Sequence, residues 1–171
     1  MKRFVLFIFA VLFCFNGYAQ EKQNHSGTYT PNIAQGEKLY QNNCANCHGT
    51  KGMGDASAAK NMLIKPVALG DPVILNQLSP EKVFDVLTHG KSDRGMPSFK
   101  NLPEKDRWDL AAYIFTLNCN FQRPSAEVRP SMNWMETRAQ TDAQLIDTLK
   151  RRGVPEKFIQ RELSAARYIL E

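Results

Sequence analysis

The sequence predicts an all-α protein, with three main helices in one folded core and a helical hairpin after it. Apolar residues recur at helical spacing in several segments, and no stretch shows the sustained alternation of a half-buried strand. Helix start and stop signals frame these segments, as where Ser79 and Pro80 precede one of them and Gly90 follows it. The length of 171 residues fits one domain with appendages.

The first 19 residues have the layout of a secretory signal peptide. Lys2 and Arg3 precede an apolar run of twelve residues at 4–15, and Ala19 ends a small-residue cleavage site. A membrane anchor fits less well, because crossing a bilayer takes about 20 apolar residues. We therefore expect export to the periplasm of a Gram-negative bacterium. Loss of the two cations lowers the formal net charge from +5 to +3, which is too mild to indicate nucleic-acid binding.

Residues 20–33 are polar and carry no apolar period, which predicts a tether. Residues 34–119 are expected to form the folded core. Its helices are predicted at about 33–43, 80–89 and 103–117. The loop between the first two, with a possible short helix at 56–63, is long for so small a core. Loops of that length are usually functional.

Residues 120–171 are predicted to form a linker and a helical extension. The linker at 120–140 is polar, and Thr141 and Gln144 then match a capping box that begins a helix. Residues 153–155 break the chain before a second helical segment. The pattern of this hairpin is equally compatible with docking on a partner, packing on its own core and self-association.

Cys44, Cys47 and His48 form a C-x-x-C-H motif, the attachment signature of c-type haem. Two thiols three residues apart on one helical turn can each add to a vinyl group of the same porphyrin. The imidazole that follows directly is placed to bind the iron as its proximal ligand. The motif and the export signal together predict one covalently bound haem c.

Two other roles for the cysteine pair fit less well. A redox dithiol belongs to a βαβ context, which the sequence does not predict. A zinc site takes four ligands, and no second C-x-x-C or H-x-x-H pair completes the set. Cys119 is the odd thiol once haem takes two, and it is either a buried inert cysteine or half of an interchain pair.

A sixth iron ligand must come from elsewhere in the chain. The candidates are Met53, Met62, Met96, Met132, Met135, His25 and His89. Met96 is favoured, because it lies in a polar loop between Gly95 and Pro97, where a methionine has little core to fill. His89 is better placed to cap the second helix at its negative dipole end. His25 lies in the tether.

Several motifs in the right order resemble the class I c-type cytochromes, especially the bacterial oxidase and reductase partners, over about residues 34–117. The matching segments are Gly36-Glu37-Lys38-Leu39-Tyr40, the C-x-x-C-H motif, a G-x-x-G-x-G-D loop at Gly49, Gly52, Gly54 and Asp55, the proline segment around Pro66, Gly95-Met96-Pro97 and the helix with Trp108. The resemblance implies the cytochrome c fold, in which three main helices wrap one haem. It also implies that the proline segment supplies a carbonyl to His48 and that Gly36 meets Tyr113 where the first and last helices cross.

Ligation by His48 and Met96 would close the iron to substrates. The expected function is therefore single-electron transfer between respiratory or reductase partners, and not enzymatic catalysis. Two alternatives remain. Displacement of Met96 would open the iron for a peroxidase or a gas-ligand sensor. The extension at 120–171 would instead make the protein a fixed subunit of a larger complex, which reaches a membrane through a partner.

Basic residues are common in the loops expected around the haem edge. They are Lys51, Lys60, Lys65, Lys91, Arg94 and Lys100. Such residues can steer an acidic redox partner or meet the haem propionates. The alternative is that they are ordinary solvated lysines. The sequence does not identify the electron donor, the electron acceptor or the oligomeric state.

Overall fold

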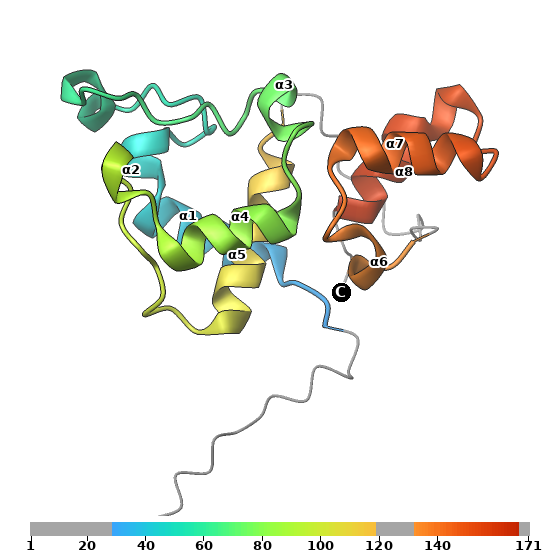
Figure 1. Cartoon of the computed structure of the whole chain (residues 1–171), viewed down its shortest axis with the longest axis horizontal. Coiled ribbons are helices and arrows are strands. Elements are labelled where there is room, and N and C mark those ends of the chain that lie inside the picture. Colours follow the sequence, from blue (N-terminus) through green and yellow to red (C-terminus); the bar gives the residue numbers. More distant parts are fainter. Residues whose placement is uncertain (1–28, 119–131, 168–171) are drawn as a thin grey trace, which may run out of the picture.

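The computed structural model describes residues 29–118 and 132–167, and within these ranges its regular structure is helical (Figure 1). The predicted all-α class is confirmed. None of the helices in these two ranges combines the length and apolar character that spanning a bilayer requires. The predicted signal peptide at 1–19, most of the tether and Cys119 lie outside the described residues.

The core is organised by the crossing of α1 (Ile33–Asn43) and α5 (Glu104–Thr116). A Cβ atom on Gly36 would lie 2.7 Å from the Cβ of Tyr113, closer than two nonbonded carbons can approach. Only glycine therefore allows the two helices to meet here. The rings of Tyr40 and Tyr113 pack beside this point with centroids 5.4 Å apart. The predicted contact between Gly36 and Tyr113 is confirmed.

The helix α4 (Pro80–His89) packs against α5. Its N-cap is Ser79, whose side chain accepts a hydrogen bond from a first-turn N–H group, and Gly90 ends it. The ring of Phe84 stacks on Trp108 with centroids 4.1 Å apart. The bounds predicted from the cap and stop signals are confirmed for this helix.

The described chain begins with a packed segment. The Tyr29 hydroxyl donates a hydrogen bond to the carboxylate of Asp109, and the N–H of Asn32 donates to the same group at 2.7 Å. Asp109 is fully buried, and Lys105 compensates its charge at 2.9 Å. The tether predicted to reach residue 33 is therefore wrong for residues 29–33. Asp109, which anchors this segment, lies 77 residues from Asn32 in the sequence, so no local pattern reveals the contact.

Four single-turn elements lie in the long loops. They are α2 (Ala45–His48), the 3₁₀ helix η1 (Ser57–Asn61), α3 (Pro72–Leu75) and the 3₁₀ helix η2 (Ser92–Arg94). The element η1 falls within the short helix predicted at 56–63. The element α2 is the helical turn expected for the C-x-x-C-H motif, whereas α3 and η2 were not predicted, because so short an element leaves too few residues for a periodic pattern.

The extension consists of α6 (Trp134–Thr137), α7 (Asp142–Arg151) and α8 (Glu156–Arg167). The predicted capping box at the start of α7 is confirmed, because the side chains of Thr141 and Gln144 each accept a hydrogen bond from the other's N–H. A second small core lies between α7 and α8, formed chiefly by Leu145, Leu149, Ile159 and Leu163.

The extension packs on the core of the same chain, which is one of the alternatives that the sequence left open. Trp134 meets Trp108 edge-on with ring centroids 6.2 Å apart. The carbonyl of Arg138 accepts a hydrogen bond at 2.9 Å from the N–H of Glu81, in the first turn of α4. Helix α8 lies against α5.

Arg167 anchors the extension from its last described residue. Its guanidinium donates to the Asp142 carboxylate at 2.8 Å and to the carbonyls of Thr137 and Gln140 at 2.9 and 2.8 Å. The same group lies over the ring of Phe115, 4.9 Å from its centroid. One buried side chain thus ties α6, α7 and α8 to α5.

Replacing Gly36 by alanine should force α1 and α5 apart, because the new methyl group overlaps backbone atoms of Asp109 and the Cβ of Tyr113. We expect the free energy of unfolding of the holoprotein to fall by ~1–3 kcal/mol in a denaturant titration. Lys38→Ala, on the exposed side of α1, is the control and should stay within ~0.5 kcal/mol of wild type. An unchanged stability of Gly36→Ala would contradict the close crossing.

Replacing Arg167 by alanine leaves Asp142 as a buried carboxylate without its cation. Breaking such a pair typically costs ~3–5 kcal/mol. We expect limited proteolysis of the variant to begin in residues 132–167, earlier than in wild type. Arg161→Ala removes a half-exposed cation of the same helix and serves as the control. Equal cleavage rates for the two variants would show that Arg167 does not hold the extension.

Candidate functional site

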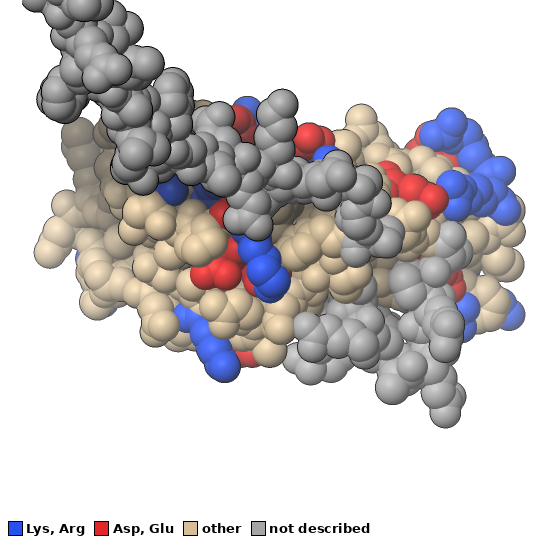
Figure 2. Space-filling model, turned by 90° about the horizontal axis from the view of Figure 1, so that it is seen from below, with Lys and Arg blue, Asp and Glu red and all other residues tan. Residues whose placement is uncertain are grey.

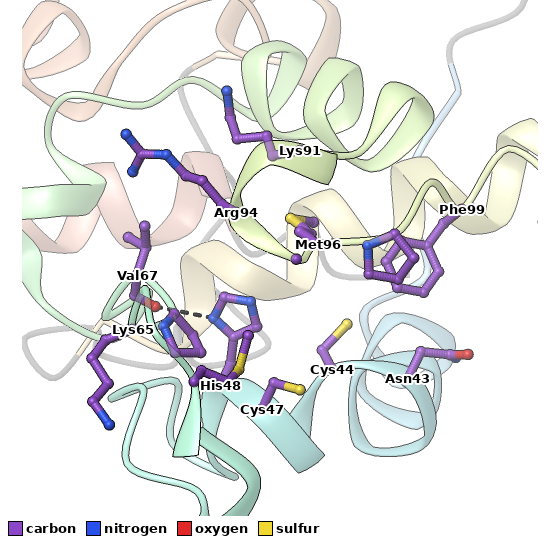
Figure 3. Close-up of a pocket in the computed structure, with 14 residues that line it drawn as sticks. Asn43, Cys44, Cys47, His48, Lys65, Val67, Lys91, Arg94, Met96 and Phe99 are labelled. Atoms are coloured by element: carbon purple, nitrogen blue, oxygen red, sulfur yellow. Dashed lines mark hydrogen bonds between the residues drawn. The ribbon is translucent and has the colours of Figure 1, made fainter. Parts of the chain in front are cut away.

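A cavity that is open to solvent lies between two walls of the core. Residues 43–67 form one wall and residues 91–99 the other (Figure 3). All four residues predicted for the site, Cys44, Cys47, His48 and Met96, line this cavity.

The short helix α2 positions the C-x-x-C-H residues. Cys44 donates its N–H to the Tyr40 carbonyl at the end of α1, and His48 donates its N–H to the Cys44 carbonyl, both at 2.8 Å. This turn places the two thiols and the imidazole on one wall (Figure 3). Neither Cys44 nor Cys47 takes part in a disulfide bond within the described residues. Burial, with a smaller effect of Cys47, raises the pKa of Cys44 to about 12, so this thiol is uncharged at neutral pH.

His48 is held by a carbonyl group in the proline segment. Its Nδ1 lies 3.0 Å from the carbonyl oxygen of Val67. Because a carbonyl only accepts, this contact assigns the proton to Nδ1 and leaves the lone pair of Nε2 for a metal. Burial lowers the pKa of His48, which favours the neutral imidazole. The carbonyl comes from Val67, the residue after Pro66, whereas the carbonyl of Pro66 packs against Gly54.

Two further hydrogen bonds fix the chain as it leaves the motif. The Tyr40 hydroxyl donates to the carbonyl of Gly49, and the N–H of Gly54 donates to the carbonyl of His48, both at 2.7 Å. Both glycines have left-handed backbone angles, with φ of 81° and 69°, which let the chain reverse within a few residues. The loop from Gly49 to Gly54 therefore holds the backbone of His48 in place.

Met96 is presented on the other wall by a tight turn. Lys91 and Met96 exchange two backbone hydrogen bonds of 2.9 and 3.0 Å, and Gly95 adopts a left-handed conformation between them. The Met96 side chain is half-buried and enters the cavity from the wall that faces His48 (Figure 3). The two predicted axial ligands therefore converge on one space from separate segments of the chain.

The other candidate ligands differ in whether they line the cavity. Met62 also lines the cavity, although no sequence feature favoured it over the other candidates. Met53 is exposed, while Met132 and Met135 pack in the two hydrophobic cores. His89 lies outside the cavity lining, and its Nδ1 contacts Asp85, as expected for a residue near a helix end. His25 lies outside the described residues.

Three cations line the cavity: Lys65, Lys91 and Arg94. The ammonium of Lys65 donates to the carbonyls of Ala59 and Lys60, both at 2.8 Å, so it closes the end of η1. Lys91 and Arg94 are exposed at the mouth. Lys51, Lys60 and Lys100 are exposed as well and do not line the cavity.

The residues fit a covalently attached haem. Two uncommitted thiols lie one turn apart, and the imidazole beside them carries its proton on Nδ1. The space in front of them is lined mainly by apolar and sulfur-containing side chains, and the opposite wall contributes a thioether. Haem c would be held by Cys44 and Cys47 through its vinyl groups and by His48 through its iron.

Comparisons with known proteins show what the chain is similar to. The family model described as cytochrome c oxidase, cbb3-type, subunit III matches residues 31–114. Cytochrome c6 of Cyanidioschyzon merolae is 28% identical over 116 residues, covering 67% of this chain and 92% of the relative. Among solved structures, a chain of the Kuenenia stuttgartiensis reducing HAO-like protein complex shares 19% identity with a TM-score of 0.46. That alignment covers 61% of this chain and 53% of the other, about half its length.

The family match at residues 31–114 includes both walls of the cavity as well as the helices that carry them. The match therefore concerns the whole haem-binding unit, of which the C-x-x-C-H motif is one part. The chain belongs to the class I c-type cytochromes, the monohaem electron carriers whose cofactor is a covalently bound haem c.

Proposed function

We propose that this protein is a periplasmic cytochrome that carries single electrons between respiratory or reductase partners, with His48 and Met96 as the axial ligands of its iron. The observation that carries the proposal is the placement of these two side chains on facing walls of one cavity. When bound, haem c supplies an iron that gains and loses one electron. The chain supplies its ligands, its surroundings and its docking surface.

The two side chains have different tasks. A thioether is a soft ligand that favours the ferrous state, so Met96 raises the reduction potential. The imidazole of His48 is kept in one orientation and one tautomer by the carbonyl of Val67. Because both ligands are held by backbone hydrogen bonds of their own segments, the surroundings of the iron need little rearrangement when an electron arrives or leaves.

The same arrangement favours a carrier over an enzyme. If His48 and Met96 both held the iron, no position would be left on it for a substrate. A peroxidase also uses a positioned acid–base group beside its open site. His89, the other histidine among the described residues, contacts Asp85 on α4 and does not line the cavity.

Two features support the cell compartment and the class of partner. The segment at 1–19 has the layout of an export signal, and bacterial c-type haem is attached outside the cytoplasm. Lys91 and Arg94 place positive charge at the mouth of the cavity, which favours redox partners with acidic docking surfaces. The apolar residues of the extension are buried within it and against α5. We therefore place the docking surface for redox partners at the mouth of the cavity.

Spectroscopy of two methionine variants tests the ligand assignment. We expect the ferric wild-type holoprotein to show the near-infrared charge-transfer band of a sulfur–iron bond. Met96→Ala should abolish this band and allow carbon monoxide to bind the ferrous form rapidly. Met62→Ala, which removes the other thioether of the cavity, is the matched control and should keep the band. Persistence of the band in Met96→Ala would transfer the ligand role to another residue.

Charge reversal at the mouth tests the docking surface. Lys91→Glu should slow oxidation of the ferrous protein by the anion ferricyanide about tenfold at low salt, and wild-type rates should fall steeply as salt rises. Lys150→Glu makes the same charge change in α7, where basic and acidic side chains gather at the far end of the molecule (Figure 2). Equal slowing by both variants would mean that only net charge matters. A salt-independent wild-type rate would rule out electrostatic steering.

A further inference from the structure

Met62 is the second thioether of the cavity, and the proposed function gives it no task. It is half-buried and lines the cavity together with Met96. Its position differs from that of Met53, which is exposed outside the lining, and from that of the methionines in the hydrophobic cores. A half-buried methionine at the edge of a cofactor cavity calls for a physical explanation of its own.

The backbone of Met62 is fixed to the wall that carries His48. Met62 follows η1 directly, and its N–H donates to the carbonyl of Ala59 at 3.2 Å. The ammonium of Lys65 donates to that same carbonyl and to the carbonyl of Lys60, both at 2.8 Å. Because η1 also packs against α2, the start of the Met62 side chain is held in place relative to His48.

The side chain of Met62 crosses to the other wall. Its terminal carbon Cε lies 3.5 Å from the point that a Cβ of Gly95 would occupy, which is an ordinary van der Waals distance. Beyond the immediate chain neighbours of Gly95, it is the one heavy atom of the described structure within 4 Å of that point. Gly95 directly precedes Met96. One side of the turn that presents the proposed ligand therefore faces the end of the Met62 side chain, while Gly95 itself stays exposed.

We propose that Met62 is a positioning residue that closes the mouth of the cavity by bridging its two walls. The inference rests on the proposed His48/Met96 ligation and deepens it. A methionine suits this task, because its unbranched chain with a polarisable sulfur fills an irregular gap without needing a hydrogen bond. The cover holds the Met96 turn against the facing wall and keeps water and small ligands from the iron.

Loss of the cover has two measurable consequences. Entry of an external ligand requires the Met96 turn to swing away, and this motion becomes easier when the turn no longer contacts Met62. Water that reaches the cavity also stabilises the more highly charged ferric state, which lowers the reduction potential. Both effects concern access and solvation, so they do not require that Met62 itself touch the iron.

Imidazole binding to the ferric holoprotein tests this role. Met62→Ala should bind imidazole about tenfold faster than wild type, which corresponds to a barrier lower by ~1.4 kcal/mol. Its reduction potential should also fall. Met62→Leu restores an apolar side chain of similar volume and should return both values close to wild type. Met53→Ala is the matched control, because it removes an exposed methionine outside the cavity lining.

The outcomes separate this inference from the proposed function. If wild type shows the sulfur–iron band and Met62→Ala binds imidazole at the wild-type rate, the cover is refuted and the ligand assignment stands. If wild type lacks the band, the assignment of Met96 fails, whatever the Met62 variants show. Loss of the band in Met62→Ala with its retention in Met96→Ala would make Met62 the ligand and would also refute the cover.

Discussion

The close crossing of α1 and α5 at Gly36 is the constraint on which the haem-binding unit depends. The helix α1 ends at Asn43, and the haem-attachment turn follows without a loop between them. The position in which α1 packs on α5 therefore determines where both thiols lie. Tyr40 extends this control, because its ring packs on Tyr113 while its hydroxyl holds the carbonyl of Gly49. A side chain at the crossing would displace the whole turn.

The wall that carries Met96 depends on α5 as well, but by another route. The N–H of Phe99 donates to the Leu87 carbonyl at 2.8 Å, and the Ser98 hydroxyl donates to the Thr88 carbonyl at 2.7 Å. The Met96 segment is thus attached to the end of α4, which packs on α5 in turn. The positions of both walls therefore depend on one buried helix, α5. Because one helix positions both walls, His48 and Met96 face each other although they lie far apart in the sequence.

The sequence carried enough information for the helices with strong local signals. Ser79, Pro80 and Gly90 bounded α4 correctly, and the C-x-x-C-H spacing identified the attachment turn, because these features act between near neighbours. The position of Met96 on the cavity agreed with the expectation from its polar loop. In each case the physical cause lies within a few residues of the feature that it explains.

The features that the sequence did not reveal depend on distant contacts. No local pattern shows that Asp109 binds the backbone and hydroxyl of the segment before α1. The choice of Val67 over Pro66 as partner of His48 depends on how a long loop folds back. The role proposed for Met62 depends on its approach to Gly95, which belongs to another part of the chain.

The extension stabilises the same helix on which both walls depend. A core of the size of residues 29–118 buries a limited share of its surface, so each large side chain on α5 matters for stability. Trp134 covers Trp108, and Arg167 covers Phe115, both on α5. The residues that line the cavity all belong to 43–99, so the described part of the extension adds this support without narrowing the cavity. Its buried ion pair joins α8 to α7, and the same guanidinium lies over Phe115 of α5.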